Sequence, residues 1–96
     1  MSQTDLFTPI KLGPYTLKNR VVMAPLTRNR SSETYVPQDL NVTYYKQRAT
    51  AGLIITEGSQ ISPQGLGYPL TPGIYNDDQI SGWKKITDAV HDEGGH

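Results

Sequence analysis

Small and polar residues follow two short apolar runs of the sequence, residues 21–24 and 53–56. The first run leads into a stretch that contains Pro25, Leu26 and Thr27. The second run leads into Glu57 and Gly58. Ligands of parallel α/β folds bind beyond the carboxyl ends of the strands, so both stretches are candidate binding segments. Thr27 offers a neutral hydroxyl that can donate to a carbonyl-type oxygen, and Gly58 lets a flat ligand approach the backbone closely.

A further candidate residue, Tyr68, lies in a long loop that is rich in glycine and proline, residues 59–75. Connections between strands and helices usually have about 2–6 residues, and much longer loops are typically functional or disordered. Tyr68 could line a pocket above a strand end, or it could simply pack the loop. A purely structural interpretation stays open for the other candidates too, because Pro25 and Gly58 can end strands and Thr27 can cap a turn.

The residue types present exclude several other kinds of site. The sequence has no Cys, which excludes disulfides, thiolate metal ligands and a Cys nucleophile. Four residues, two of them glycines, separate His91 from His96, so the two His stand at i and i+5, whereas the helical zinc motif places them at i and i+4. Gly65 and Gly67 do not begin a dinucleotide fingerprint, because Leu70 stands where the third glycine belongs. We therefore predict no metal site.

Charge balance and hydropathy restrict the partners of the chain. Nine basic residues balance nine acidic ones among 96 residues, so the positive excess expected of a nucleic-acid-binding protein is missing. No apolar run approaches the ~18 residues of a membrane span. Residues 1–5 lack the basic and apolar regions of a signal peptide. We expect a cytoplasmic protein that binds neither nucleic acid nor a membrane.

Three units are predicted to position the candidate residues. Residues 7–19 have the pattern of a β-hairpin, since apolar and polar residues alternate on both sides of the turn signal at residues 13–14. Residues 20–51 and 52–95 are predicted βα units, each beginning with an apolar run. Because these runs do not alternate, they are typical of strands that are covered on both faces, as in a parallel sheet.

The first helix is predicted over about residues 38–51. Pro37 would occupy its first turn, and Gly52 would form its left-handed C-terminal cap. The adjacent Tyr44 and Tyr45 are predicted to pack in the core.

The second helix is predicted to begin after Asn76, whose side chain can cap it, and to end at residues 94–95. An apolar stripe with nearly helical spacing would face the core. Its members are Ile80, Trp83, Ile86 and Val90.

The order hairpin, β, α, β, α predicts an α/β fold with a parallel sheet. Two strands that need cover on both faces do not close a stable unit by themselves, because each leaves an open edge. We therefore interpret residues 1–96 as the N-terminal portion of a larger single domain. The alternative is a stand-alone βαβα binding or assembly module without catalysis.

Longer motifs make this interpretation specific. Residues 6–10 (LFTPI) and 18–28 (KNRVVMAPLTR) resemble the opening of the old yellow enzyme family of flavin-dependent ene-reductases. The match continues in the same order through most of the chain. It includes residues 44–49 (YYKQRA), 52–57 (GLIITE), 67–68 (GY), 72–75 (PGIY) and 83–91 (WKKITDAVH).

The resemblance implies an N-terminal hairpin and the first two βα units of a TIM (β/α)8 barrel that binds FMN. It also implies that NAD(P)H supplies the hydride, which reduces the C=C bond of an activated alkene with a carbonyl or nitro group. Four residues would contact the flavin, namely Pro25, Leu26, Thr27 and Gly58. Tyr68 would line the substrate side. The resemblance places the catalytic residues beyond residue 96, so the remainder of the barrel would be an obligatory partner.

Overall fold

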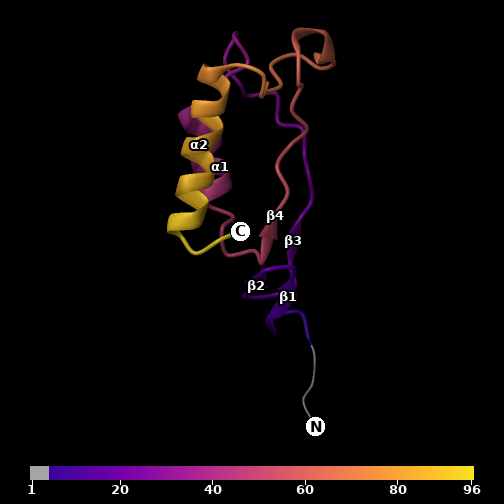
Figure 1. Cartoon of the computed structure of the whole chain (residues 1–96), viewed down its shortest axis with the longest axis vertical. Coiled ribbons are helices and arrows are strands. Elements are labelled where there is room, and N and C mark those ends of the chain that lie inside the picture. Colours follow the sequence, from indigo (N-terminus) through magenta and orange to yellow (C-terminus); the bar gives the residue numbers. More distant parts are fainter. Residues whose placement is uncertain (1–4) are drawn as a thin grey trace.

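The computed structural model describes residues 5–96. Two short β ladders and two helices make up the regular structure (Figure 1). The elements in chain order are β1 (Ile10–Leu12), β2 (Tyr15–Leu17), β3 (Val22–Met23), α1 (Asp39–Lys46), β4 (Leu53–Ile54), a 3-10 turn (Pro63–Gly65) and α2 (Asp77–Asp92).

The N-terminal ladder is an antiparallel hairpin of β1 and β2, in which Ile10 pairs with Leu17. Gly13 lies in its turn with a φ of 57°, a left-handed conformation that glycine adopts without a steric penalty. The hairpin falls within residues 7–19, where the alternating pattern predicts one.

The second ladder is parallel, as predicted, and pairs Val22 with Leu53 and Met23 with Ile54. Each strand has only two ladder residues, which is shorter than the apolar runs suggest. The two helices lie on one side of these strands (Figure 1). The other side is open within residues 5–96, because Val22 is 49% exposed and Ile55 is 44% exposed. Within residues 5–96 the helices therefore cover one face of the strands, as expected of a portion of a larger domain, and cover of the second face by the rest of that domain stays a prediction.

Helix α1 differs from the prediction at both ends. Its N-cap is Gln38, so Pro37 precedes the helix instead of standing in its first turn. The helix ends at Lys46 because the following amides bond three residues back, as when Ala49 N–H donates to the Lys46 carbonyl, and this tightens the chain. Gly52 does not have a positive φ, so the predicted left-handed cap is wrong.

Helix α2 begins as predicted. The Asn76 side chain accepts a hydrogen bond from the Gln79 backbone N–H at 2.9 Å. The predicted apolar stripe is wrong at its first position, because Ile80 is half exposed and Gln79 is fully buried in its place. The Gln79 side chain bonds to the Tyr75 backbone N–H at 3.0 Å, which explains its burial. Gly94 ends the helix region with a φ of 80°.

The main core lies between the helices and the strands, and its aromatic centre is the pair Tyr45 and Trp83, whose ring centroids are 6.2 Å apart. Three aliphatic residues complete it, namely Ala49, Ile86 and Val90. The Trp83 indole N–H donates to the Gly73 carbonyl, so α2 is tied to the end of the long loop. Tyr44 packs against this core, as predicted, but from its edge, since it is only half-buried.

Two features are absent from the part of the chain that the structure describes. Within residues 5–96, neither helix has both the length and the apolar character needed to cross a bilayer. The described residues likewise contain no cluster of three or more His, Cys, Asp or Glu side chains that could hold a metal ion.

Candidate functional site

The candidate site lies where the chain leaves the parallel ladder. After β3 and β4 the two segments continue in the same direction toward the end of the molecule that carries the long loop (Figure 1). A hydrogen bond from the Ile55 N–H to the Met23 carbonyl, at 3.0 Å, keeps them paired just beyond the ladder. The parallel pairing therefore brings the two predicted binding stretches to the same edge.

Three of the predicted site residues come together around one hollow of about 340 Å³. Thr27 borders it from the β3 segment, Gly58 from the β4 segment, and Tyr68 from the long loop. The hollow is open to solvent on the Tyr68 side, since this side chain is 68% exposed. Pro25 and Leu26 are exposed on the β3 segment but do not line this hollow.

The wall of the hollow includes two buried polar residues that the sequence analysis did not identify, Gln60 and Thr71. Gln60 Nε2 donates to the Thr71 carbonyl at 2.7 Å. The backbone of Gln60 forms an isolated parallel bridge with Gly73, and its carbonyl accepts from the Ile74 N–H at 2.9 Å. The long loop is thus closed at its base by ordered hydrogen bonds. No motif marks these residues, because the pairing joins positions 11 residues apart at the two ends of an irregular loop.

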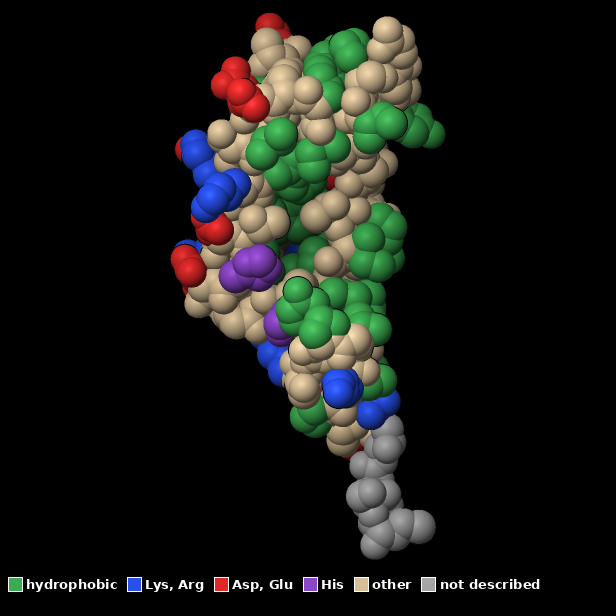
Figure 2. Space-filling view, in the orientation of Figure 1, with side chains coloured by type: hydrophobic (Ala, Val, Ile, Leu, Met, Phe, Trp, Pro, Cys, Tyr) green, Lys and Arg blue, Asp and Glu red, His purple; other side chains and the backbone are tan. Residues whose placement is uncertain are grey.

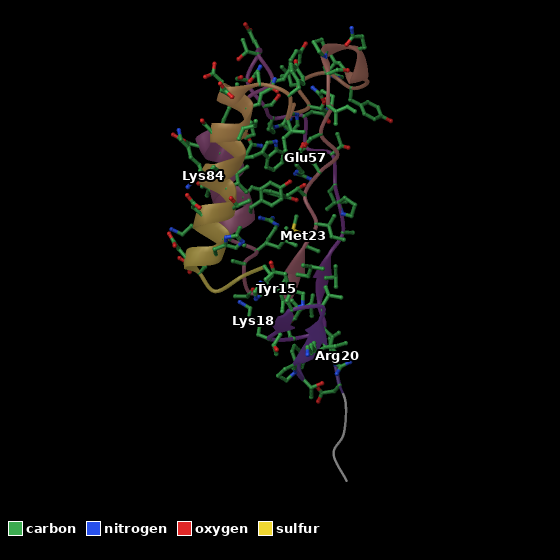
Figure 3. All side chains as sticks on the ribbon, viewed as in Figure 1. Tyr15, Lys18, Arg20, Met23, Glu57 and Lys84 are labelled. Atoms are coloured by element: carbon green, nitrogen blue, oxygen red, sulfur yellow. The ribbon has the colours of Figure 1, made fainter. Side chains whose placement is uncertain are left out.

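A buried acid lies directly before Gly58. Glu57 is 3% exposed and lies on the strand segment beside the helices (Figure 3). Its backbone N–H donates to the Tyr45 hydroxyl at 3.0 Å, and the same hydroxyl lies 3.3 Å from Glu57 Oε2. Glu57 Oε1 has no hydrogen-bond partner among the described residues. The sequence signal for this pair was a charged residue at the end of an apolar run.

The surroundings of Glu57 and Tyr45 shift the pKa values of both side chains. Burial raises the pKa of the Glu57 carboxyl, while the Arg28 backbone, the Tyr45 hydroxyl and the Arg28 charge act in the opposite direction. Burial, with a smaller effect of the nearby Glu57 charge, raises the pKa of Tyr45 to about 12. Tyr45 is therefore neutral at physiological pH and can serve as a hydrogen-bond donor to the carboxyl.

Arginine side chains form a second feature outside the hollow. The guanidinium carbons of Arg28 and Arg48 lie 4.9 and 4.1 Å from the centroid of the Tyr44 ring. These are cation–π distances, so the two guanidinium groups stabilise the part of the Tyr44 ring that the core leaves uncovered. The arrangement packs the end of the β3 segment against α1 and thereby supports the position of Thr27.

Comparison with known proteins gives a consistent result. Residues 5–96 match the family model described as NADH:flavin oxidoreductase / NADH oxidase family. The chain is 56% identical over 90 residues to 12-oxophytodienoate reductase 1 of Oryza sativa subsp. japonica, covering 93% of this chain and 23% of that protein.

Solved structures agree with the sequence match. The old yellow enzyme homologue of Zymomonas mobilis superposes with a TM-score of 0.92 at 53% identity, over 96% of this chain and 26% of that one. Morphinone reductase in complex with tetrahydroNAD superposes with a TM-score of 0.93 at 53% identity, over 98% of this chain and 26% of that one. The chain thus spans about a quarter of the length of these relatives.

Proposed function

Because the chain belongs to the NADH:flavin oxidoreductase / NADH oxidase family, we propose that it supplies the first part of an FMN-dependent ene-reductase. The complete barrel would take hydride from NAD(P)H and reduce the activated C=C bond of an α,β-unsaturated carbonyl or nitro compound. The fold prediction is confirmed, since the chain superposes on the hairpin and first two βα units of TIM-barrel enzymes.

The observation that carries the proposal is the convergence of Thr27, Gly58 and Tyr68 around one hollow at the carboxyl end of the parallel strands. This is the edge at which (β/α)8 barrels place their active sites. The three residues come from three separate segments, so their convergence is a property of the fold.

The residues present fit a flavin at this position. An added Cβ on Gly58 would meet no atom within 4 Å, so the backbone there is open to a flat ring. Thr27 is exposed at the neighbouring strand end and offers a hydroxyl donor. A flavin offers acceptor oxygens and a planar face, which are the groups that this donor and this open backbone suit.

Each residue would then have a distinct role. When bound, FMN supplies the redox chemistry, which consists of accepting hydride from NAD(P)H and passing it to the alkene. The Thr27 hydroxyl would donate to a ring oxygen, Pro25 and Leu26 would lie along the ring, and Gly58 would contact it through its backbone. Tyr68 would limit the space for substrate. The groups that anchor the substrate carbonyl and donate the proton would come from beyond residue 96.

The proposal is tested with the complete protein that contains this chain. We expect the purified protein to be yellow, with the visible spectrum of oxidised flavin. Anaerobic addition of NADPH or NADH should bleach that spectrum, and a cyclic enone should restore it. A colourless protein that remains colourless after incubation with FMN would contradict the proposal. That result would favour the stand-alone binding or assembly module.

A further inference from the structure

The loop that carries Tyr68 is closed by a pair of buried polar side chains. Gln60 is 8% exposed and Thr71 is 6% exposed, although nearly all residues between them are exposed. Gln60 Nε2 donates to the Thr71 carbonyl at 2.7 Å, and the Thr71 hydroxyl lies 3.1 Å from Gln60 Oε1. Both polar atoms of the amide are therefore used to join the two ends of the loop. We call this pair the clasp.

The clasp also touches Tyr68 directly. The Thr71 hydroxyl lies 3.1 Å from the Tyr68 carbonyl oxygen as well as from Gln60 Oε1. Because a hydroxyl has a single proton, the two acceptors share one donor. The clasp is therefore connected to the Tyr68 backbone by a hydrogen bond.

Few other contacts hold the loop tip. The side chains around Tyr68 are exposed, with Ile61 at 81%, Leu66 at 37% and Leu70 at 37%. Two polar contacts from the preceding loop reach residues next to Tyr68. Asn29 Nδ2 donates to the Pro69 carbonyl at 2.7 Å, and the Ser31 N–H donates to the Leu70 carbonyl at 3.1 Å. Since the loop buries little apolar surface, hydrogen bonds set its shape.

We infer that Gln60 and Thr71 are positioning residues that hold Tyr68 at the rim of the hollow and so determine the size of alkene that the site accepts. This inference rests on the proposed function. Both clasp residues and Tyr68 line the hollow itself, so a displaced loop changes the space above Gly58. A bulky alkene, which fills that space, should be more sensitive to the clasp than a small one.

The test uses the complete flavin-loaded protein and two substitutions at one position. Thr71→Val keeps the branched shape but removes the hydroxyl, whereas Thr71→Ser keeps the hydroxyl. Loss of one hydrogen bond should raise the KM for a bulky cyclic enone about fivefold, with kcat and flavin content little changed. The KM of the Ser variant should stay within about twofold of the unsubstituted protein. Gln64→Met, on the exposed part of the same loop, is the matched control and should change nothing.

A second measurement does not depend on activity. Amide hydrogen exchange in residues 61–70 should become faster in Thr71→Val and in Gln60→Met, and should stay unchanged in Thr71→Ser. If Thr71→Val does not fold, Gln60→Met carries the same comparison. Unchanged exchange, or faster exchange with an unchanged KM for the bulky enone, would overturn the inference. A protein that binds no flavin would overturn the proposed function, while the exchange comparison would still decide whether the clasp orders the loop.

Discussion

The buried pair of Glu57 and Tyr45 joins α1 to the segment that carries Gly58. The Tyr45 hydroxyl accepts from the Glu57 N–H and donates toward the Glu57 carboxyl, so one side chain fixes both the backbone and the side chain of its partner. A buried polar atom without a partner is costly, and Glu57 Oε1 is such an atom among the described residues. A carboxyl in this position is more stable when it holds a proton, which agrees with its raised pKa.

Stability should depend on the protonation of Glu57. Its folded-state pKa is raised above the ordinary value of 4.5, so the folded state binds more protons than the unfolded state between these two values. The free energy of unfolding should therefore fall as pH rises from 4.5 through the raised pKa. Glu57→Gln should remove this part of the slope, which has an upper bound of about 1.4 kcal/mol per pH unit. Urea unfolding of the complete protein at several pH values measures it.

The control for this prediction is Glu33→Gln, because Glu33 is exposed in the loop between β3 and α1. It should leave the slope as it is in the unsubstituted protein. An identical slope in the Glu57→Gln variant would show that the Glu57 carboxyl does not retain its proton on folding.

Thr27 should tune the potential of the proposed flavin. A hydroxyl that donates to a ring oxygen stabilises the more electron-rich reduced form, so Thr27→Ala should lower the potential. One hydrogen bond contributes about 0.5–1.5 kcal/mol. For a two-electron couple, ~30 mV corresponds to ~1.4 kcal/mol, so the shift should be a few tens of millivolts at most. Spectroelectrochemical titration measures it, and Thr27→Ser should keep the original value. An unchanged potential in the Ala variant would remove Thr27 from the flavin contacts.

Tyr68 should affect substrate and leave the cofactor in place. Because its side chain is largely exposed at the rim of the hollow, Tyr68→Phe should change the steady-state reduction of bulky enones without loss of flavin. Tyr15→Phe, in the distant hairpin, is the matched control and should behave like the unsubstituted protein. Loss of flavin as the main effect would show that the loop is structural and that Tyr68 is wrongly assigned.

Local rules predicted the elements best where a single segment fixes its own structure. The hairpin follows from alternation around a turn, and α2 follows from the Asn76 cap and its helical stripe. Full burial of Gln79 could not be predicted from local rules, because its Nε2 donates to the Thr34 carbonyl, 45 residues away, at 3.3 Å, in addition to its local bond with the Tyr75 backbone. The end of α1 was missed for a similar reason. Helix-compatible residues continue beyond Lys46, but the chain must turn there to enter β4.

Gly52 at this turn is required by contact with the hairpin side of the fold. An added Cβ would overlap the Asn19 carbonyl oxygen, which belongs to the backbone and has little freedom to move. Gly52→Ala should therefore destabilise the complete protein by about 1–3 kcal/mol, the usual cost of overpacking. Gly58→Ala is the matched comparison, since its Cβ meets no atom within 4 Å, and it should leave stability nearly unchanged. Thermal unfolding of both variants measures the difference, and equal midpoints would contradict the assignment.

On the scale of the whole molecule, the sequence placed the candidate residues next to strand ends, where the structure has them beside one hollow, and it missed the residues that close the loop. A role of the candidate residues in binding stays a prediction. Thr27 and Gly58 were identified because parallel strands bring their carboxyl ends to one edge. The positions of Gln60 and Thr71 depend on a loop conformation that local propensity does not encode.

The open face of the parallel strands was predicted from the sequence. Figure 2 shows hydrophobic side chains gathered over the strand side, while charged side chains lie mainly along the helices.

This open face leads to the prediction that residues 1–96 alone do not form a stable flavin-binding domain. Both helices cover the same side of the parallel pair, and Val22 and Ile55 remain 49% and 44% exposed on the strands. A large apolar side chain forgoes up to ~1.5–3 kcal/mol when it stays in water. Because a domain is stable by only ~5–15 kcal/mol, a few such losses decide the outcome. Unpaired edges of the two-stranded ladder would also favour aggregation or pairing with the rest of the barrel.

The isolated chain should show no cooperative thermal transition and no FMN binding by fluorescence titration. A monomer with a sharp transition and micromolar or tighter affinity for FMN would contradict this prediction and favour the stand-alone module.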